Sequence, residues 1–225
     1  MAKKVTLIKI FILLGNVVIP FYSFFLYLWR LRTTQGFIFF LFISAAIIER
    51  AWETFRTSKE RRRDEFHGDW TLAAVTISYI VLFFAIITEF YFHVKSLEIW
   101  VVLIGVALLS FSVRMRFWGM AALGKQWAVH AVGARKIKKV RIVKIGPFRY
   151  IRHPIYLGIM TECLAFPIIA GAFYSLVLAL TVCVPLVFIR ALSEEQTSVR
   201  RFGDKYLTYR KEVGMFLPTQ FFRRV

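Results

Sequence analysis

Acidic residues are scarce in this chain. Its 225 residues include 13 Asp and Glu against 31 Lys and Arg, for a formal net charge of +18 at pH 7. Such a balance usually suggests nucleic acid, but 58% of the residues are hydrophobic, and a chain this apolar needs lipid around part of its surface. We therefore assign the cations to anionic membrane lipids and to membrane topology, and expect no nucleic-acid partner.

Cysteines are few as well, and several sequence motifs are missing. The two cysteines, Cys163 and Cys183, lie in apolar runs where a thiol behaves as a small hydrophobic group, and no metal-ligand spacing surrounds them. We expect neither a disulfide nor a metal site. The patterns G-x-G-x-x-G, G-x-x-x-x-G-K-[ST], H-E-x-x-H and G-x-S-x-G do not occur, which excludes a nucleotide-binding domain of the soluble type.

Long apolar runs are what the chain has in abundance. A spanning helix needs about 20 mainly apolar residues. The sequence therefore predicts an all-α, polytopic transmembrane bundle of about six spans, or five if a short run does not cross. The first run is longer than a signal-peptide core and has no cleavage pattern after it, so we expect it to be retained. The expected spans are 7–29, 36–52, 70–92, 97–113, 155–173 and 174–190.

Lys and Arg are concentrated in alternate segments between these spans. They are frequent before the first span, in 53–69, in 114–152 and after residue 190, but sparse in 30–35 and 93–96 and absent from 171–175. The positive-inside rule then predicts that both termini are cytoplasmic, in a multi-pass protein of the cell inner membrane or the endoplasmic reticulum, depending on the source. Residues 114–154 are expected to form an interfacial segment or a topology-setting loop.

Polar residues gather immediately before the fifth expected span. Pro154 suits the first position of a helix, which places His153 near the cap. The positive end of the helix dipole, together with the Arg152 guanidinium, would receive a carboxylate or a phosphate. The alternative is that Arg152 and His153 anchor the interface, with Tyr156 in an aromatic belt.

Further polar side chains occur within or at the end of the last two spans. A carboxylate as deep as Glu162 is costly and should face a polar cavity or a partner, for which His153 or Arg152 are the candidates; it could also stay protonated or make a structural hydrogen bond. Arg190 and Glu194 share one helix face at positions i and i+4, where a local ion pair is the alternative to a functional role.

In their order along the chain, these motifs resemble the isoprenylcysteine carboxyl methyltransferase and phospholipid methyltransferase superfamily of membrane enzymes. The resemblance covers roughly the C-terminal half. It implies that 1–113 holds four N-terminal spans and that 114–225 is a methyltransferase core with a cytoplasmic loop, a helical hairpin and a C-terminal cytoplasmic helix. The matching residues are Leu123-Gly124-Lys125-Gln126-Trp127, the run from Gly146 to Tyr156 with its R-H-P-x-Y pattern, Glu194-Glu195, Phe202-Gly203-Asp204-Lys205-Tyr206, Tyr209 and Pro218.

The resemblance implies S-adenosylmethionine as the cofactor, held at the cytoplasmic edge, and a lipophilic substrate that enters from the bilayer. Arg190 would then grip an acidic oxygen nucleophile or an anionic headgroup, and His153 or Glu162 would be the base if the acceptor were a phenol or an enol. These three are the expected catalytic residues. The expected cofactor contacts are Ile142, Val143, Phe148, His153, Pro154, Ile155, Tyr156 and Glu194, with Arg152 added by the helix-entrance argument.

Some departures from the family pattern bear on the substrate. Position 148 is Phe where the family commonly has Tyr, and the segment before Gly146 lacks the His of the eukaryotic carboxyl methyltransferases. Residues 161–167 look more like small bacterial members, some of which methylate lipophilic polyketides.

The alternatives to an O-methyltransferase are a phospholipid N-methyltransferase and, from another class, a non-catalytic membrane protein that keeps the fold. Reduction with a nicotinamide cofactor is a further alternative, because sterol reductases have a related C-terminal architecture. Those enzymes are larger and have more spans, and this chain is too short to resemble them closely.

Overall fold

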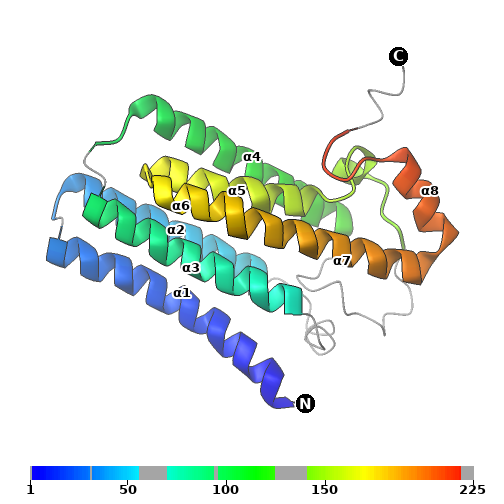
Figure 1. Ribbon diagram of the computed structural model, residues 1–225, viewed down its shortest axis with the longest axis horizontal. Coiled ribbons are helices and arrows are strands. Elements are labelled where there is room, and N and C mark those ends of the chain that lie inside the picture. The colour runs from blue at the N-terminus through cyan, green and yellow to red at the C-terminus, as the bar shows by residue number, and fades with distance from the viewer. Residues whose placement is uncertain (1, 31, 56–69, 94–95, 125–140, 219–225) are drawn as a thin grey trace.

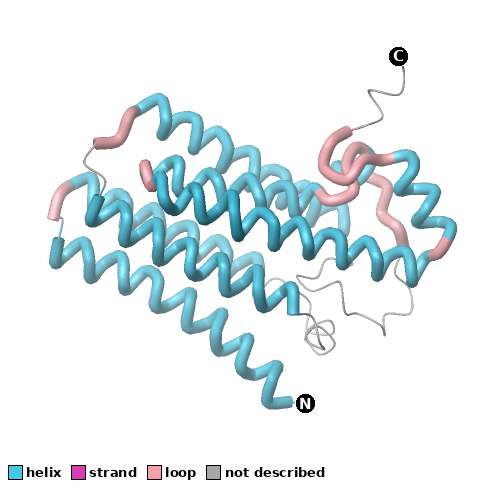
Figure 2. The backbone as a smooth tube through the Cα atoms, viewed as in Figure 1, coloured by secondary structure: helices cyan, strands magenta, loops and turns pink. Residues whose placement is uncertain are grey.

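The computed structural model describes residues 2–30, 32–55, 70–93, 96–124 and 141–218. Helices make up nearly all of these residues, and no strand occurs among them (Figure 2). The all-α expectation is confirmed. The helices are α1 (Ala2–Arg30), α2 (Thr34–Phe55), α3 (Trp70–His93), α4 (Ile99–Leu123), the 3₁₀ helix η3 (Gly146–Arg149), α5 (Pro154–Ala170), α6 (Phe173–Leu178), the π-helical segment η4 (Ala179–Cys183), α7 (Val184–Phe202) and α8 (Asp204–Glu212).

The long helices run roughly along one axis, and α8 lies at one end of the bundle (Figure 1). The N-terminal end of α1 and the C-terminal end of α7 lie at this same end. In the described part of the chain, four helical segments are long and apolar enough to cross a membrane: Thr34–Glu53, Trp70–His93, Ile99–Leu123 and Phe173–Phe202. The chain is therefore a polytopic membrane bundle, whereas the count of six spans and the cytoplasmic position of the termini stay predictions.

Two helices extend beyond the expected spans. The fourth expected span ends at 113, but α4 continues to Leu123. The last helix continues past 190 to Phe202, in agreement with the helix face that Arg190 and Glu194 were predicted to share. The reason is that the charges beyond these points are buried and paired. Arg116 in α4 is 1% exposed and Glu195 in α7 is 3% exposed, and each forms ion pairs within the protein. The expected boundary at 113 between two parts of the chain consequently falls inside α4.

Helices α4 and α5 pack against each other through glycines. A Cβ atom added at Gly105 would lie 2.6 Å from Ile169, and one at Gly158 would lie 2.7 Å from the Arg116 side chain. Close approach of two helices through small residues is the usual packing mode in membranes. It brings the polar face of α4 against α5, at the depth where Glu162 lies.

The connection between α5 and α6 is as short as expected from residues 171–175. Gly171 ends α5 in the left-handed conformation with φ 66°, which a residue without Cβ adopts at little cost. Glu89 of α3 then accepts hydrogen bonds from the backbone nitrogens of Tyr174 (2.9 Å) and Ser175 (2.8 Å). A carboxylate at a helix N-terminus satisfies otherwise unpaired N–H groups. Glu89 therefore has a structural role.

The last long helix contains one π-helical turn. Pro185, two residues after the end of this turn, has no N–H to offer to the carbonyl of Thr181, so regular α-helical bonding is interrupted there. The turn absorbs this interruption without ending the helix. As a result, one continuous rod carries Arg190, Glu194 and Glu195 from the bundle interior toward α8.

Candidate active site

The helix entrance at the start of α5 has the predicted local structure. Pro154 is the first residue of the helix and His153 is its N-cap residue. The residues before it are tied to the C-terminal segment, because Arg152 N donates to Gly214 O (2.9 Å) and His153 N donates to Met215 O (3.1 Å). The entrance is therefore held by backbone hydrogen bonds to a segment about sixty residues later in the chain.

Glu195 joins the side chains of the entrance. The Arg152 Nε donates to Glu195 Oε1 at 2.6 Å, and the His153 Nε2 lies 3.2 Å from the same oxygen. Arg152 Nη1 also donates to the carbonyl oxygens of Arg210 (3.1 Å) and Val213. Arg152 thus holds the C-terminal segment in place, a role that the sequence argument did not assign to it. That argument placed Glu194 in the site and missed the buried Glu195.

Two tyrosines of α8 support the same region. Tyr206 and Tyr209 are buried, and burial raises the pKa of both hydroxyls well above the usual range for tyrosine. Both therefore stay protonated at physiological pH. The Tyr209 hydroxyl donates a 2.6 Å hydrogen bond to the carbonyl oxygen of Phe148, which fixes the backbone just ahead of the helix entrance.

A cavity of about 360 Å³ lies next to this entrance and extends into the bundle. All but one of the predicted site residues line it. Its inner part is lined by apolar residues from the first three helices, including Ile19, Ile47, Leu72 and Ile80. The predicted residues that line it are Ile142, Val143, Phe148, Arg152, His153, Pro154, Ile155, Tyr156, Arg190 and Glu194.

Arg190 is a buried cation in the cavity wall. It is 3% exposed, and its Nη1 donates to the Thr71 hydroxyl at 3.1 Å. Thr71 lies in the first turn of α3 and was not singled out from the sequence, because a threonine at the start of an apolar run carries no signal of its own. The contact fixes the guanidinium between α3 and α7, on the same cavity as Glu194.

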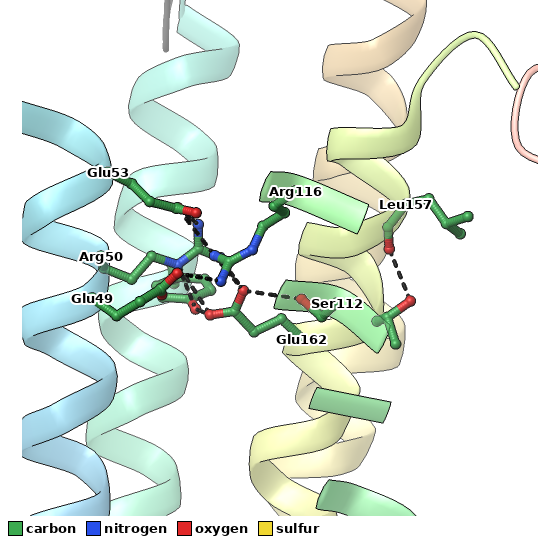
Figure 3. Close-up of polar contacts among 9 residues, drawn as sticks. Glu49, Arg50, Glu53, Ser112, Arg116, Leu157 and Glu162 are labelled. Atoms are coloured by element: carbon green, nitrogen blue, oxygen red, sulfur yellow. Dashed lines mark hydrogen bonds and ion pairs between the residues drawn. The ribbon is translucent and has the colours of Figure 1, made fainter. Parts of the chain in front are cut away.

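Glu162 is the predicted site residue that lies elsewhere. It does not belong to the cavity lining, and the expectation that His153 or Arg152 would pair with it is wrong. Its partners are Arg50 and Arg116, the latter with Nη1 at 2.7 Å from Glu162 Oε2 (Figure 3). The entrance residues are unable to pair with Glu162 in this arrangement, because Glu195 already engages them.

Glu162 belongs to a buried cluster of charges between four helices, which we call the central ion cluster. Its carboxylate also accepts hydrogen bonds from the Tyr79 hydroxyl and from Ser112 Oγ (3.4 Å). Carboxylates of α2 complete the cluster, since Arg116 donates to both Glu49 (2.8 Å) and Glu53 (3.1 Å). The members of the central ion cluster are Glu49, Arg50, Glu53, Tyr79, Ser112, Arg116 and Glu162 (Figure 3).

Sequence reasoning missed most of this cluster. Arg50 lies near the end of the second expected span, 36–52, and Arg116 lies in the segment expected to be interfacial or a topology-setting loop. The available signal was that Glu49, Arg50 and Glu53 stand together at the end of an apolar run, since ionisable groups within spanning segments tend to pair with one another. Residues 125–127 of the family pattern and the basic segments 56–69 and 125–140 lie outside the described residues.

Comparisons with known proteins relate part of the chain to a family of methyltransferases. Residues 103–199 match the model of the isoprenylcysteine carboxyl methyltransferase family. The uncharacterized protein YpbQ of Bacillus subtilis is 25% identical over 165 residues, which are 71% of this chain and 95% of that protein. The protein-S-isoprenylcysteine O-methyltransferase of Schizosaccharomyces pombe is 32% identical over 104 residues, 46% of this chain and 44% of the enzyme.

A third relative extends the range of acceptor chemistry. The methanethiol S-methyltransferase of Pseudomonas deceptionensis is 38% identical over 72 residues, 32% of this chain and 26% of the enzyme. The match thus spans less than half of the length of either named methyltransferase. Together with the apolar helices, these matches define the class as a membrane methyltransferase. The part of the chain from α4 to α7 is thus similar to the isoprenylcysteine carboxyl methyltransferase family, whose model matches residues 103–199.

Proposed function

We propose that this protein transfers the methyl group of S-adenosylmethionine to an oxygen atom, of a carboxylate or a hydroxyl, on a lipophilic substrate. The observation that carries the proposal is that one cavity joins the polar entrance of α5 to an apolar interior between the first three helices. A water-soluble donor and a lipid-soluble acceptor reach opposite ends of such a cavity. The methyl transfer then takes place between the two.

The polar end of the cavity has the side chains that S-adenosylmethionine requires. The rings of Phe148 and Tyr156 suit an aromatic base, the Glu194 carboxylate suits ribose hydroxyls or an ammonium group, and the positive end of α5 at His153 suits a carboxylate. Ile142, Val143, Pro154 and Ile155 line the same end with apolar surface. Arg152 supports this site through Glu195.

When bound, S-adenosylmethionine supplies a methyl group on a positively charged sulfur that is a good leaving group. The chain therefore needs to align the acceptor and to exclude water. Arg190 is suited to hold a negatively charged acceptor, because its guanidinium lines the cavity and is fixed by Thr71. The apolar lining from α1 to α3 favours a long hydrocarbon chain, which enters from the bilayer.

Calorimetric binding of S-adenosylmethionine to the detergent-solubilised protein tests the proposal. We expect saturable binding that is lost in Glu194→Ala and in His153→Ala. The matched control is Glu98→Ala, because Glu98 is exposed at the start of α4 and lies outside the cavity lining. Absence of binding by the folded, unmodified protein in lipid would overturn the methyltransferase proposal in favour of a non-catalytic membrane protein.

The acceptor class is tested next with the protein in lipid bilayers. An S-isoprenylcysteine carboxylic acid, a long-chain phenol and phosphatidylethanolamine are offered separately, and methylated products are measured by mass spectrometry. We expect methylation of the acid or the phenol. Methylation of phosphatidylethanolamine alone would replace the oxygen acceptor with a nitrogen acceptor and would identify a phospholipid N-methyltransferase.

A further inference from the structure

The cavity wall also contains a carboxylate with an unused oxygen atom. Glu53 lines the cavity and is 6% exposed. Its Oε2 accepts hydrogen bonds from Nη1 of Arg50 (3.0 Å) and Nη1 of Arg116 (3.1 Å). Its Oε1 is buried and accepts no hydrogen bond from any residue that the structure describes. Leaving a buried acceptor without a donor costs about 1–3 kcal/mol, so a ligand that brings a proton to this oxygen is favoured.

The charges around Glu53 also favour the uptake of a proton. The central ion cluster has three carboxylates against two guanidiniums, so it holds one negative charge more than it has positive charges to balance it. One added proton makes the cluster neutral, and a net charge is costly inside a membrane. The groups that face Glu53 are Glu49 and Arg50 of α2, Tyr79 of α3, Arg116 of α4 and Glu162 of α5.

The other candidate bases are less suited to this task. Glu162 accepts from two arginines, a tyrosine and a serine, and it does not line the cavity. The His153 ring is 3.2 Å from Glu195 and belongs to the entrance of α5. Among the described carboxylates that line the cavity, Glu53 has the buried oxygen without a hydrogen-bond partner, whereas Glu194 is only partly buried and lies at the end assigned to the cofactor.

We propose that Glu53 is the proton acceptor of the reaction and that the methyl acceptor is a lipophilic hydroxyl or thiol rather than a preformed carboxylate. This inference rests on the proposed methyltransferase function. A lone pair of the acceptor oxygen or sulfur forms the new bond to the methyl carbon, the bond from that carbon to the sulfonium breaks, and its electron pair stays on the departing sulfur. The acceptor proton passes to the Glu53 carboxylate and later to water.

The test compares Glu53→Gln with Glu49→Gln in the full chain in lipid bilayers. Both changes remove one negative charge from the same cluster and both residues pair with Arg116, but only Glu53 lines the cavity. The probes are two phenols with the same dodecyl tail, one of them made acidic by a nitro group so that it is ionised at about pH 8, together with dodecanethiol and an S-isoprenylcysteine carboxylic acid.

We expect Glu53→Gln to lower kcat for the plain phenol by roughly 10²- to 10⁴-fold, which is the usual contribution of a general base. The loss should nearly vanish for the nitrophenol, because its proton is already gone. The KM for the phenols and the calorimetric affinity for S-adenosylmethionine should change little. Glu49→Gln should lower kcat for the plain phenol far less than Glu53→Gln does, because it weakens the negative charge that favours proton uptake but leaves the Glu53 carboxylate in place.

Three results would overturn the inference while leaving the methyltransferase proposal intact. These are an equal loss for both phenols in Glu53→Gln, an equal loss in Glu49→Gln, and an unmodified protein that binds the cofactor but methylates only the carboxylic acid. If Glu53→Gln does not fold, as judged by lost cofactor binding, Glu53→Asp replaces it. Its shorter carboxylate should still favour the nitrophenol over the phenol, and the absence of that preference overturns the inference. Methylation of dodecanethiol but not of either phenol would support Glu53 as the proton acceptor and would replace the oxygen acceptor of the proposed function with sulfur.

Discussion

Replacing Arg116 with Met should destabilise the protein severely. Arg116 is 1% exposed and its guanidinium contacts Glu49 at 2.8 Å, Glu53 at 3.1 Å and Glu162 at 2.7 Å. With Arg116 the central ion cluster has a formal charge of −1, from two guanidiniums and three carboxylates, and without it the charge becomes −2. Removing one partner of a buried ion pair costs about 3–5 kcal/mol, and we expect the loss in unfolding free energy to reach at least that range.

A double-variant cycle with Glu162→Leu makes this reasoning testable. The single change Glu162→Leu brings the formal charge of the cluster to zero, and the double variant Arg116→Met/Glu162→Leu restores it to −1. The double variant should therefore be less unstable than the sum of the two single changes, by about 1–3 kcal/mol. Unfolding would be followed by circular dichroism in mixed micelles as a function of denaturing detergent. Additive effects, or a loss below about 1 kcal/mol for Arg116→Met, would refute the argument.

Further changes test the packing and the entrance of α5. Gly158→Ala should cost about 1–3 kcal/mol of unfolding free energy, because its Cβ would lie 2.7 Å from Arg116, whereas Ser110→Ala on the exposed side of α4 should stay within about 0.5 kcal/mol. Glu195→Ala should weaken cofactor binding at least tenfold in calorimetry, because Arg152 loses the carboxylate that orients it; unchanged affinity would contradict this role. Tyr209→Phe should cost about 1 kcal/mol, because it removes the hydrogen bond to a backbone carbonyl. Since burial raises the pKa of the Tyr209 hydroxyl above its unfolded value, this stabilisation should be constant from about pH 6 to 9 and fall only as the pH rises above about 10, where the unfolded chain releases the proton. A change of stability in the variant relative to the parent between pH 6 and 9 would show that the hydroxyl ionises early.

Local features of the sequence predicted the helix entrance well. Pro154 at the first helical position and His153 at the cap follow from the dihedral restriction of proline alone. The placement of Arg190 and Glu194 on one cavity agrees with their spacing of four residues in a helix. These predictions needed no knowledge of other helices. Knowledge of other helices was needed, however, to decide whether Glu194 or Glu195 contacts the side chains of the entrance.

The sequence alone does not predict which charged residues pair when they are far apart along the chain. Arg116 and its carboxylate partners in α2 are 63 and 67 residues apart, and Arg50 and Glu162 are 112 residues apart. A charged residue next to an apolar run has the same local pattern whether it meets headgroups or a buried partner. For this reason the sequence predicts an interfacial segment or a topology-setting loop at Arg116, and a fourth span that ends at 113 although α4 continues to Leu123.

The attachment of the C-terminal segment to the entrance of α5 has a consequence for biosynthesis. The backbone bonds from Arg152 and His153 reach Gly214 and Met215, which leave the ribosome after the described helices α1 to α7 have been made. Insertion of these helices and completion of the binding site are thus separate events, with the second delayed until residues 214 and 215 have been made. A polypeptide that is cut short just before residue 213 should insert normally yet never acquire a competent site.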